Sequence, residues 1–207
     1  SPVRPERRLP VRFLKEAMNR NAVILAVLAA PLPLACAETL METPAPIKVK
    51  DARNCYRLSP ELYRSGQPGG DGFKALEKLG LKSVLNLREY HSDADEAEHT
   101  GLRLYRIKLA AGKVTREELM DCLLVISRAP KPVLVHCWHG SDRTGIVCAA
   151  YRIVMQGWTP EKALEELMDE RFGHHRSYYS NLAELVRDTD WKAFKEEFRR
   201  KRQAQGV

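Results

Sequence analysis

The stretch of sequence that decides the fold is Val133-Leu134-Val135-His136-Cys137-Trp138-His139-Gly140-Ser141-Asp142-Arg143-Thr144-Gly145. It opens with a short apolar run and is followed by a helical pattern. A strand that stops at Cys137 and restarts as a helix at Arg143 leaves a tight arc of inward-pointing backbone N–H groups, and the helix N-terminus adds positive potential. Such an arc binds a tetrahedral oxyanion. Residues 137–143 are called the Cys137 loop below.

The side chains of the Cys137 loop suit the hydrolysis of a phosphate ester by a cysteine. A thiol at a helix N-terminus beside an arginine loses its proton readily, so we expect Cys137 to be a thiolate nucleophile. The planar fork of Arg143 is expected to hold two phosphate oxygens in a way that a lysine would not reproduce. The hydroxyl of Thr144 is placed to assist the sulfur as it leaves a phosphocysteine intermediate. His136 is expected to orient the loop rather than to act as a base.

The other residues of this stretch are the candidates for contact with a bound phosphoester. They are Trp138, His139, Gly140, Ser141 and Gly145. The two glycines remove a Cβ atom where the chain bends or where the backbone approaches a ligand or a neighbouring element. No metal site is predicted, because the adjacent His174 and His175 lack further ligands at suitable spacing and are expected to lie on the surface.

The run resembles the H-C-x5-R-[S/T] signature of the protein tyrosine phosphatase superfamily, and its Asp-Arg-Thr-Gly ending is similar to a bacterial dual-specificity-like branch. Two upstream blocks extend the resemblance over residues 54–185: Leu62-Tyr63-Arg64-Ser65-Gly66-Gln67-Pro68 and Leu79-Gly80-Leu81-Lys82-Ser83-Val84-Leu85-Asn86-Leu87-Arg88. The resemblance implies an α/β cysteine phosphatase fold, with a mostly parallel sheet of about four to five strands flanked by helices. It also implies hydrolysis of phosphomonoesters, from phosphorylated proteins or small molecules, without a cofactor.

The identity of the general acid is open, because the sequence departs from the family pattern. Most members carry an acidic aspartate on the loop that follows the strand expected here over residues 102–109, yet residues 110–114 contain no carboxylate. Related branches with the same loop ending are expected to use its aspartate, so Asp142 is the candidate acid. The alternative is that Asp142 holds the loop by hydrogen bonds. The acidic residues of the 89–99 stretch offer other carboxylates that could lie over the site, but a solvated loop-and-helix face is the favoured interpretation.

Three alternatives to a phosphotyrosine-type phosphatase remain. An inositol-phosphate or lipid-phosphate phosphatase of the same fold is less favoured, because the loop lacks the lysine that phosphoinositide-directed relatives often carry. A catalytically weak phosphate-binding pseudophosphatase would not need Cys137. A buried structural cysteine is the usual fate of a free thiol, but it would not explain the rest of the motif.

The remaining sequence alternates between strand and helix patterns, which predicts an α/β sandwich. We expect a helix over 71–79, strands over 81–87 and 102–109, and a helix opened by a capping box at Thr115 and ending near Arg128. Another helix is expected from Pro160 to about Glu170. A last helix carries the aromatic stripe of Trp191, Phe194 and Phe198, which should dock on the body of the domain. Cys122 and Cys148 fall in apolar helical patterns and are expected in the core.

The amino-terminal 37 residues are typical of a targeting segment. An apolar run from Ala22 leads to Ala35-Cys36-Ala37, which has the pattern of a signal-peptide cleavage site. We therefore expect residues 1–37 to be an extension and signal peptide, with export to the periplasm after cleavage at Ala37, and residues 38–207 to be the phosphatase domain. Residues 1–17 are expected to be an upstream extension. The alternative is an uncleaved hydrophobic anchor.

Charge gives little reason to expect a nucleic-acid partner. The chain carries a net charge of +7 over 207 residues. Residues 1–37 hold six basic and two acidic residues, so the remainder has 28 basic and 25 acidic residues and a net charge of only +3. The basic run Arg199-Arg200-Lys201-Arg202 at the end of the last helix could make weak contact with an anionic membrane surface. A solvated helix end is the simpler interpretation.

Overall fold

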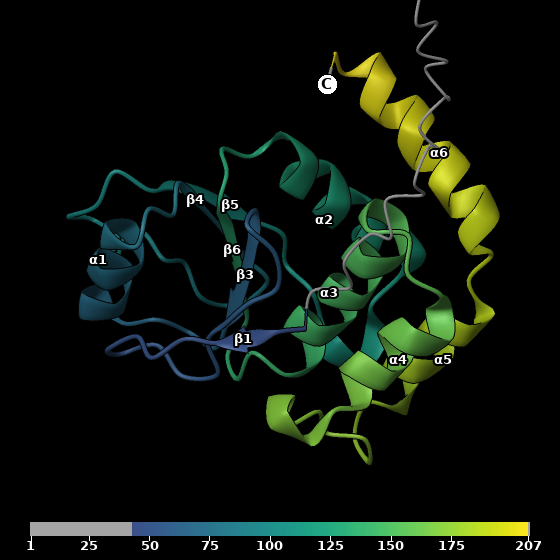
Figure 1. Cartoon of the computed structure of the whole chain (residues 1–207), viewed down its shortest axis with the longest axis horizontal. Helices are drawn as coiled ribbons and strands as arrows, with labels where there is room; N and C mark the ends of the chain where they lie inside the picture. Colours follow the sequence, from purple (N-terminus) through teal and green to yellow (C-terminus); the bar gives the residue numbers. More distant parts are fainter. Residues whose placement is uncertain (1–42, 207) are drawn as a thin grey trace, which may run out of the picture. The chain divides into compact units, whose positions relative to one another are not determined.

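A six-stranded sheet lies at the centre of the described residues, 43–206, in the computed structural model (Figure 1). The strands are β1 Ala45–Pro46, β2 Tyr56–Arg57, β3 Leu62–Ser65, β4 Ser83–Asn86, β5 Arg103–Arg106 and β6 Val133–His136, in the order β1-β2-β3-β6-β4-β5. β3, β6, β4 and β5 are parallel neighbours, whereas β1 and β2 add antiparallel pairs at one edge. The predicted mostly parallel α/β sheet is confirmed, with six strands rather than four or five.

The parallel strands bring their carboxyl ends together at one edge of the sheet. His136 at the end of β6 is in register with Ser65 of β3 and with Asn86 of β4, which in turn pairs with Arg106 of β5. Four loops therefore leave the same edge, which is where ligands bind in open α/β sheets. The Cys137 loop follows β6, one of the two inner strands of this set.

Helices cover both faces of the sheet. They are α1 Gly70–Lys78, α2 Arg116–Arg128, α3 Asp142–Met155, α4 Pro160–Met168, α5 Ser180–Asp188 and α6 Trp191–Ala204, with short 3₁₀ helices η1 Ala111–Lys113 and η2 Glu170–Phe172. Figure 1 shows α1 on one side of the sheet and α2 to α6 on the other. Alternate side chains of β6 pack on opposite faces of the sheet. Val133 and Val135 belong to the larger hydrophobic core, whereas Leu134 belongs to the core beside α1. Burial on both faces explains the continuous apolar run of this strand.

Helix ends follow the signals in the sequence. The Thr115 hydroxyl accepts from the Glu118 backbone N–H at 3.2 Å, and the Glu118 carboxylate accepts from the Thr115 N–H at 2.8 Å, which completes the predicted capping box. Pro160 occupies the first turn of α4 as expected. The aromatic stripe of α6 is buried: Trp191, Phe194 and Phe198 are at most 7% exposed. The last helix therefore docks on the domain as predicted.

The predicted core positions of Cys122 and Cys148 are confirmed, since both thiols are buried and free. Burial raises the pKa of Cys148 to about 11, so this thiol is not a thiolate at neutral pH. The predicted upstream extension, signal peptide and cleavage point lie outside the described residues. Within residues 43–206, no helix is both long and apolar enough to cross a membrane.

Candidate active site

The Cys137 loop forms the predicted arc between β6 and α3. The thiol of Cys137 is 2% exposed, and the backbone N–H of Gly140 donates a hydrogen bond to its Sγ atom over 3.3 Å. Helix α3 begins at Asp142, with Ser141 as its N-cap, so the positive end of the helix dipole faces the arc. The hydroxyl oxygen of Thr144 is buried and has no protein partner among the described residues.

The carbonyl groups of the loop are held outward by earlier segments of the chain. The carbonyl oxygens of residues 138, 139 and 140 accept hydrogen bonds from the backbone N–H of Gln67 at 3.0 Å, from Nδ2 of Asn54 at 3.0 Å and from Nη2 of Arg64 at 2.7 Å. Because peptide groups are planar and trans, the N–H groups of the same peptides point to the opposite side, into the arc. This arrangement provides the inward-facing amides of an oxyanion site.

Arg64 is a buried cation that sequence analysis did not single out. It is 1% exposed, and its guanidinium carbon lies 3.9 Å from the centre of the Phe172 ring. Its contact with Gly140 requires close approach of the loop to β3. A Cβ atom at Gly140 would lie 2.5 Å from the backbone nitrogen of Gly66, and its φ of +79° also favours glycine. The sequence signal was present, because Arg64 falls in one of the two upstream blocks.

His136 is clamped between the loop and a buried carboxylate. Its Nε2 atom lies 2.8 Å from Oδ2 of Asp93, and its Nδ1 atom lies 3.2 Å from the carbonyl oxygen of Cys137. Nε2 of Gln67 donates to the other oxygen of Asp93 over 2.9 Å. Burial alone would raise the pKa of Asp93, but the hydrogen bonds from His136 and Gln67 bring it below its ordinary value. These contacts fit a positioning role for His136.

The expectation that residues 89–99 form a solvated face is wrong for Asp93, which is 4% exposed. The acidic composition of this stretch gave no sign that one carboxylate would turn inward. Its partner His136 comes from the end of β6, far along the chain, so only the fold brings the two together.

Arg143 lies in the first turn of α3. Its Nη1 atom donates to the carbonyl oxygen of Leu109 over 3.3 Å, and its side chain lines a cavity of about 360 Å³. The cavity walls are largely aromatic or imidazole groups, from Trp138, His139, His175, Tyr178 and Tyr179, together with Ala111 and Asp142. Trp138 is 46% exposed, and its expected contact with substrate stays a prediction.

Arg88 packs against the ring of Trp138, and the sequence analysis did not identify it as a site residue. Its guanidinium carbon is 4.2 Å from the centre of the Trp138 ring, and its Nη1 atom donates to Oε1 of Gln67 over 2.8 Å. Burial and the nearby charge of Arg143 lower the pKa of Arg88. A second cavity, of about 850 Å³, is lined by Arg88, Arg53 and Trp138 among others. This cavity therefore carries two arginines together with the carboxylates of Asp51 and Glu96.

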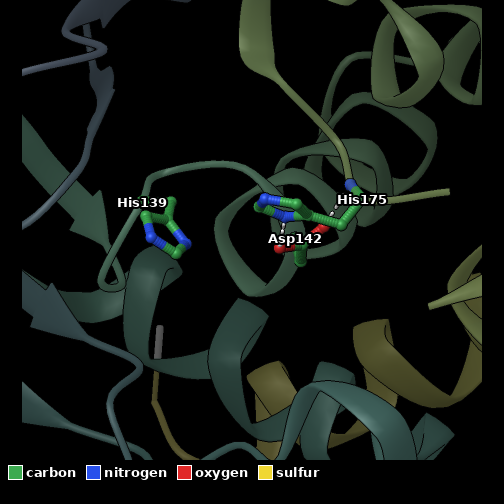
Figure 2. A group of neighbouring side chains, drawn as sticks. All are labelled: His139, Asp142 and His175. Atoms are coloured by element: carbon green, nitrogen blue, oxygen red, sulfur yellow. Dashed lines mark hydrogen bonds and ion pairs between the residues drawn. The ribbon is translucent and has the colours of Figure 1, made fainter. Parts of the chain in front are cut away.

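Asp142 is tied to two histidines that the sequence places on the surface (Figure 2). Its Oδ1 atom accepts from the backbone N–H of His175 at 2.9 Å and lies 2.8 Å from Nδ1 of His174, whereas Oδ2 lies 2.8 Å from Nδ1 of His175. Burial opposes ionisation, but hydrogen bonds from His174 and His175 lower the pKa of Asp142 to about 2. The surface prediction is wrong for His174, whose side chain is 1% exposed.

The surroundings of Asp142 favour the loop-holding alternative over the role of general acid, because a carboxyl group with so low a pKa carries no proton at neutral pH. The loop after β5 adds no other carboxylate. Its residue Ala111 lines the cavity, and the carbonyl of Ala111 is held by Nδ2 of Asn181 at 3.0 Å. Among the residues that line this cavity, Asp142 is the sole carboxylate.

At Gly145 the backbone approaches a neighbouring element, which is one of the two reasons expected for a glycine there. A Cβ atom there would lie 2.6 Å from Cδ1 of Leu167 in α4. Gly145 therefore allows close packing of α3 against α4. Ser141 is buried at the start of α3, and its Oγ atom lies near Gly173.

Comparisons with known proteins agree with this geometry. Residues 52–197 match the model of the tyrosine phosphatase family. The chain is 38% identical over 160 residues to the dual specificity protein phosphatase TpbA of Pseudomonas aeruginosa, covering 73% of this chain and 72% of that protein. A crystal structure of TpbA in complex with phosphotyrosine superposes with a TM-score of 0.69 at 30% identity, over 76% of this chain and 96% of that one.

A second group of relatives is named for a different substrate. Inositol diphosphatase SIW14 of Saccharomyces cerevisiae is 30% identical over 149 residues, covering 67% of this chain and 53% of that protein. Its catalytic core superposes with a TM-score of 0.62 at 25% identity, over 74% of this chain and 96% of that one. By sequence match and by fold, the chain belongs to the tyrosine phosphatase family.

Proposed function

We propose that this phosphatase hydrolyses phosphotyrosine and related phosphomonoesters through a phosphocysteine intermediate on Cys137. The observation that carries the proposal is the buried thiol of Cys137 under the N–H of Gly140, 3.3 Å away, inside an arc whose amides face inward. A thiolate is stabilised there by the same groups that bind a phosphate.

The reaction follows from this placement in two displacements. The sulfur of Cys137 attacks phosphorus, the bond to the ester oxygen breaks, and that oxygen leaves as an alcohol or phenol once it gains a proton. Water then attacks the phosphocysteine, which releases inorganic phosphate and restores the thiolate. The loop amides and Arg143 stabilise the negative charge on the phosphoryl oxygens in both steps. Thr144 assists departure of the sulfur in the second step.

The nature of the cavity supports an aryl phosphate as substrate. Trp138, Tyr178 and Tyr179 line it, and they offer flat apolar surfaces against which a tyrosine ring can pack. A phenolate also leaves with less help than the alkoxide of serine, because the phenol of tyrosine has a pKa of about 10. This difference matters in a cavity whose sole carboxylate, Asp142, is held ionised.

The same lack of an acid favours one second candidate, the cleavage of a diphosphate group on an inositol. Its leaving group is itself a phosphate, which needs no proton from the protein to depart. The guanidinium groups of Arg53 and Arg88, which both contact the ring of Trp138, would suit the additional phosphates of such a substrate. The relatives named inositol diphosphatases support this candidate as well.

A substrate panel separates the candidates. Values of kcat/KM are compared for a phosphotyrosine peptide, a phosphoserine peptide, an inositol diphosphate and an inositol polyphosphate that carries only monoesters. The proposal predicts the highest value for phosphotyrosine and low values for phosphoserine and the monoester inositol. A dominant rate with the inositol diphosphate would select the second candidate.

Cys137→Ser tests the mechanism itself. We expect the variant to lose turnover while it still binds vanadate or a phosphotyrosine peptide, because the loop amides and Arg143 remain. Appreciable turnover by the variant would exclude the thiolate mechanism. Phosphate affinity without turnover in the unmodified protein would instead identify a pseudophosphatase.

We also propose that residues 18–37 direct export and that cleavage follows Ala37. Cell fractionation of the full chain in a Gram-negative host, with sequencing of the mature amino terminus, tests both points. A mature protein that starts at Glu38 in the periplasm is the expected result, and retention of residues 18–37 would support the anchor alternative. Contact of residues 199–202 with anionic vesicles stays a prediction, to be checked by co-sedimentation.

A further inference from the structure

Three side chains with metal-ligating atoms meet beside Arg143. One ligand atom from each of His139, Asp142 and His175 lies within 4.8 Å of the other two. Figure 2 shows that two of them come from the Cys137 loop and its junction with α3, whereas His175 comes from the segment that follows η2. The imidazole rings of His139 and His175 are 5.3 Å apart, centre to centre.

We propose that His139, Asp142 and His175 bind a divalent zinc ion, and that this ion reversibly inhibits the phosphatase. Two imidazole nitrogens and one carboxylate oxygen form a common donor set for zinc. Magnesium and calcium are poor matches, because they prefer oxygen ligands throughout. The inhibition rests on the proposed phosphatase activity, whereas binding of the ion does not.

The geometry needs only small movements to hold the ion. With metal–ligand bonds of about 2.0–2.2 Å and tetrahedral angles, ligand atoms lie roughly 3.3–3.5 Å apart. The most distant pair, which lies within 4.8 Å, must therefore close by at most about 1.5 Å, and Nδ1 of His175 must open from its present 2.8 Å to Oδ2 of Asp142. On binding, Nδ1 of His175 must give up the proton that it donates to Oδ2 of Asp142, so that its lone pair faces the metal and the ring proton is on Nε2.

The carboxylate of Asp142 is already fixed in a suitable orientation. Its Oδ1 atom is occupied by Nδ1 of His174 and by the backbone N–H of His175, so Oδ2 is the oxygen turned toward the cluster. The side chain of His174 is 1% exposed and therefore rigidly placed. Such outer partners orient metal ligands and strengthen binding.

An ion at this position would obstruct the reaction. Arg143 follows Asp142 directly, and its side chain lines the same cavity as all three ligands. Three protein ligands leave the fourth position of zinc to water, which would occupy the space that a phosphoester needs. The ion would also hold His139 and Asp142 in one arrangement of the Cys137 loop.

A second group of potential ligands, His91, Asp93 and Glu96, provides an internal control. Its carboxylate Asp93 is already engaged, because its two oxygens bond Nε2 of His136 and Nε2 of Gln67. We therefore expect zinc to prefer the cluster beside Arg143.

Calorimetric titration of zinc into the Cys137→Ser protein tests binding without interference from the thiolate. One ion per chain is expected. His139→Phe and His175→Phe, each in this background, should weaken binding by at least about tenfold, since loss of even an outer partner costs 10–100-fold. His91→Phe and His99→Phe are matched controls that should leave the affinity unchanged. Because His139 is exposed, its replacement does not disturb the core.

Inhibition is measured with Cys137 intact, and each variant is compared with its own metal-free rate. Zinc should inhibit the unmodified protein, added chelator should restore the rate, and His139→Phe and His175→Phe should be at least about tenfold less sensitive. Absence of binding, full affinity in both variants, or loss of affinity in His91→Phe would overturn the site. Undiminished inhibition of both variants would show that zinc acts at the thiolate instead. Absence of phosphatase activity would leave the calorimetric result intact.

Discussion

Replacement of Asp142 by asparagine separates its two candidate roles. If Asp142 only holds the Cys137 loop against His174 and His175, then Asp142→Asn should slow an activated nitrophenyl ester and a phosphotyrosine peptide by similar factors. If Asp142 protonates the leaving group, the peptide should lose far more rate, because nitrophenolate departs without a proton. The three hydrogen bonds to the carboxylate lead us to expect similar losses.

The stability change expected for this variant follows from the pKa of Asp142. A fall from the ordinary value of 3.8 to about 2 in the folded protein corresponds to about 2 kcal/mol of stabilisation by the ionised carboxylate. The folded-state pKa lies below the unfolded one, so this stabilisation is present above about pH 4 and is lost as the pH falls toward 2. Asp142→Asn should therefore be less stable than the unmodified protein at pH 7, and this difference should vanish near pH 2.

Urea denaturation at pH 7 and at lower pH, with chelator in every buffer, gives the free energies of unfolding of the unmodified protein and of Asp142→Asn. The other carboxylates, including Asp93, titrate in both proteins, so their contribution drops out when the free energy of unfolding of the variant is subtracted from that of the unmodified protein. Initial rates with the two substrates are measured on the same preparations. A variant of unchanged stability that fails only with the phosphotyrosine peptide would refute the loop-holding role and restore Asp142 as the acid.

Arg143→Lys keeps the charge but loses the planar fork, so kcat/KM for phosphotyrosine should fall by about 100-fold or more in steady-state assays. A variant with near-full activity would show that Arg143 contributes only its positive charge. Gly140→Ala should lower the free energy of unfolding by about 1–3 kcal/mol in urea, because its Cβ would meet the backbone nitrogen of Gly66 at 2.5 Å. Asp93→Ala should cost about 1–3 kcal/mol in the same assay, because Nε2 of His136 loses its buried acceptor. Chelator alone should leave the phosphatase rate unchanged, and a strong loss would indicate metal-dependent chemistry.

Local signals in the sequence predicted the elements that carry their own end markers. Helix α2 spans residues 116–128 as expected, because a capping box opens it and Pro130 follows it. The two predicted strands at 81–87 and 102–109 are longer than β4 and β5. Three leucines are buried although they lie outside the strands: Leu81, Leu87 and Leu109. The apolar pattern therefore overestimates the length of the hydrogen-bonded strands. The strands β1 and β2 have two residues each, which is too short for an alternating pattern of apolar and polar residues.

The part of the site that could be predicted is the part that is continuous in sequence. The Cys137 loop supplies nucleophile, amides and arginine within seven residues, and its local conformation follows from the strand before it and the helix after it. Arg64, Asp93 and His175 reach the loop only through the fold. Asp93 shows the difficulty, since its acidic neighbours are typical of a solvated segment while its own side chain is buried against His136.

The outward hydrogen bonds of the loop carbonyls have a consequence for the binding of inorganic phosphate. Arg64, Asn54 and Gln67 fix three successive peptide groups by contacts that do not involve a ligand. The entropy of ordering these peptides is therefore lost once, when the chain folds, and binding an anion need not immobilise them again. The product of one turnover meets the same ready-made site as the next substrate, so free phosphate should compete with substrate.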